Sequence, residues 1–372
     1  MMKDALYGGV NAAVLTAMND DLSVNLDRMA LHCRWLLANG CNGLGVLGTT
    51  GEANSLGVSE RIALMEGLAE RGIDPSRMLP GCGVPAITDT VVMAKRAGEL
   101  GCRGVLVLPP FFYKNPSEDG LFAYFSEVVQ RVGGAVAIYL YHFPAQSAVP
   151  LTVPLIERLR RAYGPAVRGI KDSTGSWANT KGYIDAFARD GFEVYCGDDS
   201  HLHQVLQAGG AGSISAASNV SCASNAAVYA GWDTDAGAVA QRTLTAMRGA
   251  VTSAALIPGL KALVARHTGD TGWRNIRPPH MRLSAEQEAK LFATFDACGV
   301  ELARAACRPP DGSVPGFPTR PHSRTGEANR VALGDDEPDR FAAARPLAAP
   351  AAIQRPGGDG VARRIAGQQQ GL

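Results

Sequence analysis

A lysine at the end of an apolar segment is the residue in this sequence best suited to covalent chemistry. Lys171 closes the run Val167–Lys171, and lysine is rarely buried unless it is paired or functional. Burial favours the neutral amine, which can attack a carbonyl carbon. The alternative is an ion pair of Lys171 with Asp172 or Asp198 at the rim of the fold. Other polar residues that end apolar segments are Thr49 and Thr50, within GTTGE at 48–52, and Tyr141 and His142, within YHFP at 141–144.

Two further patterns suggest cofactors only weakly. Residues 43–48 match the GxGxxG pattern of dinucleotide-binding turns, but those glycines must follow a strand and open a helix. Here a helical segment precedes them, and they lie within a predicted strand. His201 and His203 are two positions apart, a spacing that does not share a helix face, and no carboxylate–histidine motif accompanies them. We therefore expect no NAD, no other cofactor and no metal site.

Strand-like and helical segments alternate before residue 216 and could bring these residues together. Eight short apolar runs joined by helical crossovers predict a TIM (β/α)8 barrel, with a doubly wound open sheet as the alternative. In a barrel the carboxyl ends of the strands converge on one pocket, where Lys171, Tyr141 and Thr49 would meet. The predicted strands are Gly9–Leu15, Gly43–Leu47, Met78–Cys82, Gly104–Leu108, Val136–Tyr141, Val167–Lys171, Glu193–Cys196 and Gly212–Ser215, and the helical patterns include Leu26–Ala38, Ser59–Glu70, Asp89–Leu100 and Ser117–Val132.

The composition divides the chain into three parts. We expect the barrel over residues 1–218 and a C-terminal helical region over 219–307. The last 65 residues, 308–372, contain nine prolines and nine glycines with little apolar periodicity. Such a segment cannot bury enough apolar surface to offset its ordering entropy. It is therefore predicted to be a disordered tail, or sequence outside the functional frame of the gene.

Removal of everything after about Pro310 is expected to leave folding and turnover nearly unchanged, because few core contacts can depend on such a tail. Thermal melts and activity of the full-length and shortened proteins test this. A drop of many degrees in the melting temperature would contradict it.

Four motifs occur in the order and spacing of one enzyme family. They are GTTGE at 48–52, YHFP at 141–144, GIKD at 169–172 and GDD at 197–199. The sequence resembles the dihydrodipicolinate synthase / N-acetylneuraminate lyase family of Schiff-base enzymes that act on pyruvate, over about residues 7–300. The resemblance implies a TIM barrel with a C-terminal helical region, often assembled as a homotetramer or homodimer.

The resemblance also implies roles for individual residues. Lys171 would form the imine with pyruvate or another 2-oxo acid. Tyr141 would relay protons above the imine, with its hydroxyl oriented by Thr49. The substrate carboxylate would be held by Thr50 and by nearby backbone N–H groups such as that of Gly48. A protonated imine is an electron sink, so the adjacent carbon–carbon bond can form or break through an enamine, and a phenol within hydrogen-bond reach can shuttle the proton. The backbone carbonyl of Ile214 would also face the substrate.

Three positions depart from the synthase pattern. Gln146 stands where the synthases have an arginine that binds the carboxylate of the second substrate, and His142 stands where the family usually has asparagine, facing the pocket or its wall. Gln146, Ser147 and His142 are expected to bind hydroxyl groups of the second substrate. The tyrosine that the synthases supply across the subunit interface corresponds to Phe112 or Tyr113, depending on a one-residue gap. These departures favour a lyase of the aldolase type. Such an enzyme forms a 2-oxo-3-deoxy acid from pyruvate and an aldehyde, or cleaves that acid into the two. The alternatives are dihydrodipicolinate synthase, a 2-oxo-3-deoxy acid dehydratase, and a catalytically silent ligand-binding barrel.

The charge and hydropathy of the chain exclude some partners. Lysine and arginine total 36 against 35 acidic residues, a net charge of +1, which argues against broad electrostatic binding of nucleic acid. No apolar run approaches the roughly 20 residues that span a bilayer, and the N-terminus does not resemble a signal peptide. The eight cysteines form no CxxC pair, so buried reduced thiols are expected. These features predict a cytoplasmic protein that contacts no membrane.

Overall fold

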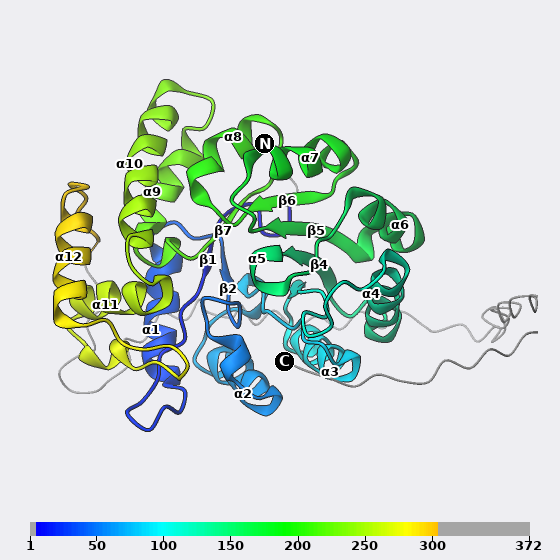
Figure 1. Ribbon diagram of the computed structural model, residues 1–372, viewed down its shortest axis with the longest axis horizontal. Coiled ribbons are helices and arrows are strands. Elements are labelled where there is room, and N and C mark those ends of the chain that lie inside the picture. Colours follow the sequence, from blue (N-terminus) through cyan, green and yellow to red (C-terminus); the bar gives the residue numbers. More distant parts are fainter. Residues whose placement is uncertain (1–4, 304–372) are drawn as a thin grey trace, which may run out of the picture. The chain divides into compact units, whose positions relative to one another are not determined.

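Parallel strands arranged as a barrel form the centre of the structure (Figure 1). The computed structural model describes residues 5–303, so the predicted tail at 308–372 lies outside the described residues. Seven strands pair in the order β2-β1-β7-β6-β5-β4-β3. Each neighbouring pair is parallel, as expected when helices connect the strands. The strands are β1 (Gly9–Ala13), β2 (Gly43–Gly45), β3 (Gly104–Val107), β4 (Ala137–His142), β5 (Val167–Asp172), β6 (Glu193–Cys196) and β7 (Gly212–Ser215).

The predicted strand Met78–Cys82 joins the two ends of this sheet without forming a regular ladder. The Leu79 N–H donates to the Leu44 carbonyl of β2 at 2.9 Å, and the Leu106 N–H of β3 donates to the Pro80 carbonyl at 2.9 Å. Proline has no N–H to donate in return, which explains why only isolated bridges are present. The segment nevertheless connects β2 to β3, so the prediction of a TIM barrel is confirmed over that of an open sheet.

The four helical patterns predicted from the sequence are present, with shifts of at most two residues at their first positions. Side-chain caps explain two of the starts: Asn25 accepts a hydrogen bond from the Arg28 N–H, and Ser117 accepts one from the Gly120 N–H. The helices are α1 (Leu26–Ala38), α2 (Val58–Glu70), α3 (Ile87–Leu100), α4 (Glu118–Val132), α5 (Pro144–Ser147), α6 (Val153–Tyr163), α7 (Trp177–Phe187), α8 (Leu202–Gln207), α9 (Ser218–Ala230), α10 (Asp235–Thr252), α11 (Leu256–Thr268) and α12 (Ala285–Asp296).

Alternation along the strands creates two separate apolar layers. Ile138 and Leu140 of β4 point outward against the helices, whereas Tyr139 and Tyr141 point into the barrel. The hydroxyl of Tyr139 donates to the buried Glu193 carboxylate at 2.8 Å, near the amino end of the strands. The amino half of the barrel is therefore filled, and the carboxyl ends are left to form a site. The interior cluster comprises Tyr7, Ala13, Leu79, Leu106, Tyr139, Tyr141, Tyr195, Ala211 and Ile214.

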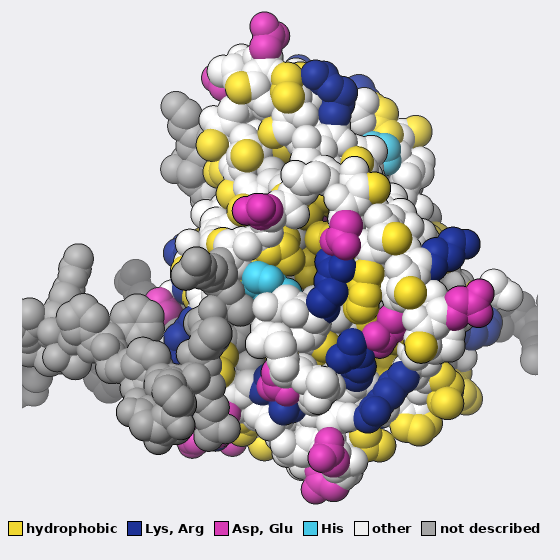
Figure 2. Space-filling model, turned by 90° about the vertical axis from the view of Figure 1, so that its left-hand side faces the viewer, with side chains coloured by type: hydrophobic (Ala, Val, Ile, Leu, Met, Phe, Trp, Pro, Cys, Tyr) yellow, Lys and Arg dark blue, Asp and Glu magenta, His cyan; other side chains and the backbone are white. Residues whose placement is uncertain are grey.

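Between β7 and residue 303, the described chain is mostly helical. Helix α9 packs against β1 and β7 in the ring of barrel helices, and α10, α11 and α12 pack on one another beside it (Figure 1). On the face that includes these helices, basic and acidic side chains are interspersed (Figure 2). Ion pairs such as Arg266 with Asp296, at 2.7 Å, contribute to this surface. The predicted domain boundary between residues 218 and 219 stays a prediction.

Candidate active site

Lys171 and Tyr141 lie side by side within the barrel because β4 and β5 pair in that register. The two residues are direct partners in the parallel ladder, so their side chains project from the same face of the sheet. Both are buried, with exposed fractions of 5% for Lys171 and 4% for Tyr141. The amine nitrogen of Lys171 lies 4.5 Å from the centroid of the Tyr141 ring, within range of a cation–π contact. The predicted pair of residues is thus brought together.

The Lys171 amine has no carboxylate partner within residues 5–303. Asp172 instead accepts hydrogen bonds from the hydroxyls of Thr180 at 2.6 Å and Thr174 at 2.9 Å. Asp198 accepts from the Ser200 N–H at 3.0 Å. The alternative expectation of an ion pair at the rim is therefore wrong for both aspartates. A buried amine held beside a phenol, without a counter-charge, is suited to attack on a carbonyl.

Thr49 lies beside Tyr141, at the turn that follows β2. Its hydroxyl shares a hydrogen bond with the Tyr141 hydroxyl at 3.2 Å. Thr50 is buried next to it. Gly48, Thr49 and Tyr141 line a small pocket together with Leu106. A Cβ on Gly48 would meet no neighbouring atom closer than 3.9 Å, so its backbone borders open space. These residues provide hydroxyl and backbone donors next to the tyrosine hydroxyl.

Ile214 contributes to the barrel interior from β7, two strands from the turn that carries the threonines. It is fully buried in β7, and its side chain belongs to the same interior cluster as Tyr141. It pairs in register with Asn11 of β1. The predicted role of its backbone carbonyl stays a prediction.

His142 points away from this interior, so the expectation that it contacts substrate needs correction. It follows Tyr141 by one residue, and successive side chains of a strand point to opposite faces. Its Nδ1 lies 3.2 Å from Asp172 Oδ1 and 3.0 Å from the Tyr183 hydroxyl of α7. Burial acts to raise the pKa of Asp172, but hydrogen bonds from His142 and Thr180 outweigh it and hold that pKa below its usual value. His142 therefore lies in the wall between barrel and helices.

The residues predicted to contact the second substrate differ in their exposure to solvent. Gln146, in the one-turn helix α5, is exposed, and its backbone N–H donates to the Phe143 carbonyl at 3.0 Å. The Ser147 hydroxyl is buried and already bonded to the Phe143 and Val149 carbonyls, each at 3.1 Å. Phe112 and Tyr113 stand in the loop after β3 with exposed fractions of 73% and 65%.

Arg168 and Arg274 do not take the place of an arginine at position 146, because each is paired elsewhere. Arg168, at the amino end of β5, is paired with Glu193 at 2.7 Å. Arg274 is paired with Glu288 of α12 at 2.8 Å. Neither guanidinium is available to a substrate at the carboxyl ends of the strands.

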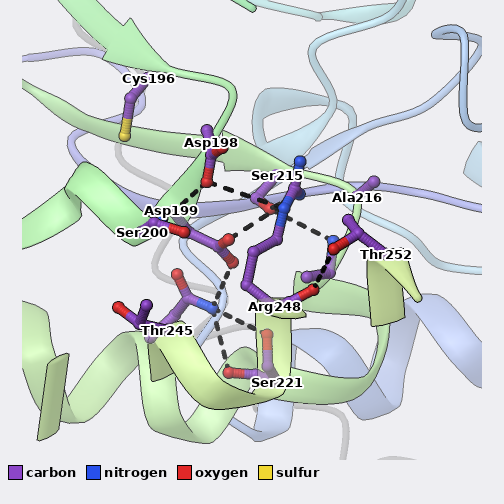
Figure 3. A network of polar contacts seen from close by, with 12 residues as sticks. Cys196, Asp198, Asp199, Ser200, Ser215, Ala216, Ser221, Thr245, Arg248 and Thr252 are labelled. Carbon is purple, nitrogen blue, oxygen red and sulfur yellow. Dashed lines mark hydrogen bonds and ion pairs between the residues drawn. The ribbon is translucent and has the colours of Figure 1, made fainter. Parts of the chain in front are cut away.

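A polar network at the ends of β6 and β7 was not predicted in full (Figure 3). The GDD motif places Asp198 and the fully buried Asp199 there, and Arg248 of α10 reaches between them at 3.7 and 3.8 Å. Asn225 of α9 donates to Asp199 at 3.1 Å, and Arg248 donates to the Ser215 hydroxyl at 3.4 Å. Burial raises the pKa of Asp199, while Arg248 and Asn225 act against that rise. The network fixes this side of the barrel mouth.

A second buried lysine was missed altogether. Lys261 of α11 is 1% exposed and forms an ion pair with Glu52, in the loop after β2. The available signal was the same one that identified Lys171, a single lysine within an apolar segment, LIPGLKALV. Its partner could not be inferred because it lies 209 residues away in the chain.

Comparisons with known proteins point to one family. The profile of the Dihydrodipicolinate synthetase family matches residues 6–298. An uncharacterized DapA-like lyase of Chloroflexus aurantiacus is 34% identical over 294 residues, which are 77% of this chain and 96% of that protein. A 4-hydroxy-tetrahydrodipicolinate synthase of Kineococcus radiotolerans is 30% identical, over 80% of this chain and 95% of its own.

Solved structures agree with these relatives. The crystal structure of dihydrodipicolinate synthase from Agrobacterium tumefaciens has a TM-score of 0.73 and 33% identity, covering 78% of this chain and 99% of its own. A prophage protein of the dihydrodipicolinic acid synthase family from E. coli K12, solved in complex with pyruvate, has a TM-score of 0.73 and 26% identity. The match covers 79% of this chain and 99% of the E. coli protein.

The structure adds two observations on other kinds of site. Across residues 5–303, no group of three or more histidine, cysteine, aspartate or glutamate side chains is arranged to hold a metal ion. Among the helices of that same region, none is both long and apolar enough to cross a membrane.

Proposed function

Because the chain belongs to the dihydrodipicolinate synthetase family of Schiff-base lyases, we propose that it is an aldolase that joins pyruvate to an aldehyde, or cleaves the resulting 2-oxo-3-deoxy acid, through an imine on Lys171. The observation that carries the proposal is the buried Lys171 amine, without a carboxylate partner in the described chain and 4.5 Å from the Tyr141 ring. Tyr141 is in turn hydrogen-bonded to Thr49.

In the proposed mechanism, the neutral Lys171 amine attacks the keto carbon of pyruvate. Tyr141 protonates the departing hydroxyl, so that water leaves and a protonated imine remains. The resulting Tyr141 phenolate takes a proton from the methyl carbon, which gives an enamine. The enamine attacks the aldehyde carbon, and Tyr141 returns this proton to the aldehyde oxygen as the new carbon–carbon bond forms. Hydrolysis of the imine then releases the 2-oxo acid and restores the amine. The imine itself accepts the electron pair, so the scheme requires no other electron sink.

The remaining predicted residues hold the substrate in this scheme. Thr50 and the backbone N–H of Gly48 would bind the carboxylate, because hydroxyl and amide donors can fix an anion without a full positive charge. The carbonyl of Ile214 would face the substrate. Thr49 keeps the Tyr141 hydroxyl directed toward the reacting carbon.

The proposed choice of a neutral second substrate depends on position 146. Gln146 offers an uncharged amide, and Arg168 and Arg274 are both engaged in ion pairs elsewhere. The second candidate is 4-hydroxy-tetrahydrodipicolinate synthase, which is the name of relatives such as the Kineococcus protein. A dehydratase could use the same imine. A silent scaffold would have no need for a buried amine beside an oriented phenol.

We also propose that the chain works as a homodimer or homotetramer in the cytoplasm. Phe112 and Tyr113 are exposed neighbours whose ring centroids lie 5.5 Å apart, and exposed aromatic side chains are enriched at subunit contacts. The seven described cysteines are free thiols, as expected in a reducing compartment.

Borohydride added together with pyruvate is expected to inactivate the protein and to leave a reduced pyruvate adduct on Lys171, because borohydride reduces the imine to a stable amine. Peptide mass mapping identifies the modified residue. Lys171→Ala should give no adduct and no turnover, while Lys181→Ala, which removes an exposed lysine of α7, should behave like the unmodified protein. An adduct on another lysine, or none at all, would overturn the proposal.

A further inference from the structure

We propose that the buried ion pair between Glu52 and Lys261 positions the loop of residues 48–52, here named the threonine loop, and thereby sets the affinity for the 2-oxo acid. The inference rests on the proposed function, since it assumes that Thr49 and Thr50 of this loop handle the substrate. Lys261 would be a positioning residue that acts through the loop and touches no substrate.

The contacts of the pair come entirely from the protein. The Lys261 Nζ pairs with Glu52 Oε1 and donates to the Asn275 carbonyl at 2.6 Å. The second carboxylate oxygen of Glu52 accepts the Arg277 N–H at 3.1 Å. Both side chains are sealed from solvent, with exposed fractions of 1% and 0%. Burial lowers the pKa of Lys261, whereas the Glu52 carboxylate acts to raise it.

The threonine loop is short and tightly seated, so the position of Glu52 is transmitted to the threonines. The Glu52 N–H donates to the Thr49 carbonyl at 3.1 Å, and the Thr16 hydroxyl of the neighbouring segment donates to the Gly51 carbonyl at 2.6 Å. Glu52 itself has a left-handed backbone, with φ of 55°, a conformation that most residues adopt only when their surroundings impose it. The ion pair supplies such a constraint.

Stability alone does not explain an ion pair at this place. Desolvation of two buried charges offsets much of their attraction, so a buried ion pair is weak evidence for a gain in stability. A charged pair differs from an apolar pair by being directional. Arg277 adds to the same connection, because its guanidinium donates to the Ser55 carbonyl at 2.6 Å and pairs with Glu60. The C-terminal helical region is thus joined to the threonine loop and to the start of α2.

The test replaces both charges at once and measures pyruvate binding through imine trapping. In the double variant Glu52→Leu/Lys261→Met no unpaired charge is left, but the Asn275 carbonyl and the Arg277 backbone N–H each lose a partner, so the protein is expected to fold with a lowered melting temperature. The pyruvate concentration that half-saturates borohydride trapping on Lys171 is expected to rise about tenfold, comparable with the loss of one hydrogen bond to a carboxylate. The maximal trapping rate should change less than threefold.

The matched control removes a different ion pair of the C-terminal region. Arg274→Met/Glu288→Leu eliminates a bidentate pair that does not contact the threonine loop, and its half-saturating pyruvate concentration should be that of the parent. If the first double variant does not fold, the single variant Glu52→Gln is measured in its place. Glutamine retains the shape of the side chain and one acceptor for Lys261. The pyruvate concentration that half-saturates trapping is expected to rise threefold or more.

The outcomes separate this inference from the proposed function. A folded double variant with an unchanged half-saturating concentration would show that the pair is only structural. An equal rise in the control would show a general effect of weakening the C-terminal region, and would also overturn the inference. If the parent protein itself traps no pyruvate on Lys171, the proposed function fails, and the inference fails with it.

Discussion

Tyr141→Phe is expected to slow exchange of the pyruvate methyl protons with solvent by about 10²- to 10⁴-fold, the usual contribution of a positioned acid–base group. The variant keeps the ring against Lys171 but removes the hydroxyl that is bonded to Thr49. Exchange reports formation of the enamine and can be followed by NMR in deuterated water. It requires no knowledge of the aldehyde, so the result depends only on the first half of the mechanism.

The matched control is Tyr124→Phe, which removes a buried hydroxyl of α4 that has no hydrogen bond to Thr49, Tyr141 or Lys171. Tyr124 donates to the Val84 carbonyl at 2.7 Å, and its loss should cost about 1 kcal/mol of stability without affecting exchange. Thr49→Val should slow exchange as well, but less than Tyr141→Phe, because the phenol would remain without its orienting partner. Exchange in Tyr141→Phe within threefold of the parent rate would show that another group moves the proton.

The sequence predicted well which residues lie at the ends of the strands. It predicted less well whether each side chain points into the barrel or toward the helices. Lys171, Tyr141 and Thr49 follow apolar runs, and the convergence of strand ends in a barrel was sufficient to bring them together. His142 was placed less well because both faces of a parallel barrel strand are buried. With apolar residues on both faces, no polar alternation reveals which face a histidine occupies. Only the register of Tyr141 with Lys171 decides it.

Contacts between segments that are distant in the chain could not be predicted from local sequence patterns. Glu52 and Lys261 belong to different parts of the chain, and nothing near either residue identifies its partner. The segment Met78–Cys82 has the composition of a strand, and it does link the edges of the sheet. Its irregular pairing follows from Pro80, which was visible in the sequence, together with the close approach of Gly81, where a Cβ would lie 2.1 Å from the Leu47 carbonyl.

Condensation of pyruvate with glyceraldehyde is expected to have a higher kcat/KM than condensation with aspartate semialdehyde. An arginine binds a carboxylate with two charge-assisted hydrogen bonds, whereas the amide of Gln146 offers only neutral donors and an acceptor. The missing contact corresponds to about 1.5–3 kcal/mol, or roughly ten- to a hundredfold in affinity. Steady-state rates with both aldehydes at saturating pyruvate measure the ratio. A tenfold preference for aspartate semialdehyde would instead restore the synthase function.

Gln146→Arg provides the complementary result and should narrow the gap by raising kcat/KM for aspartate semialdehyde. Gln130→Arg adds the same charge to an exposed position of α4 and should leave the ratio unchanged, which separates a local contact from general electrostatic attraction. Arg248 is an arginine at the carboxyl ends of β6 and β7, but it lies between the carboxylates of Asp198 and Asp199. Its guanidinium already faces both of these side chains, so it is not free to pair with an acid group on a substrate. A neutral, hydroxylated aldehyde needs no such partner, so the position of Arg248 and the glutamine favour the same substrate class.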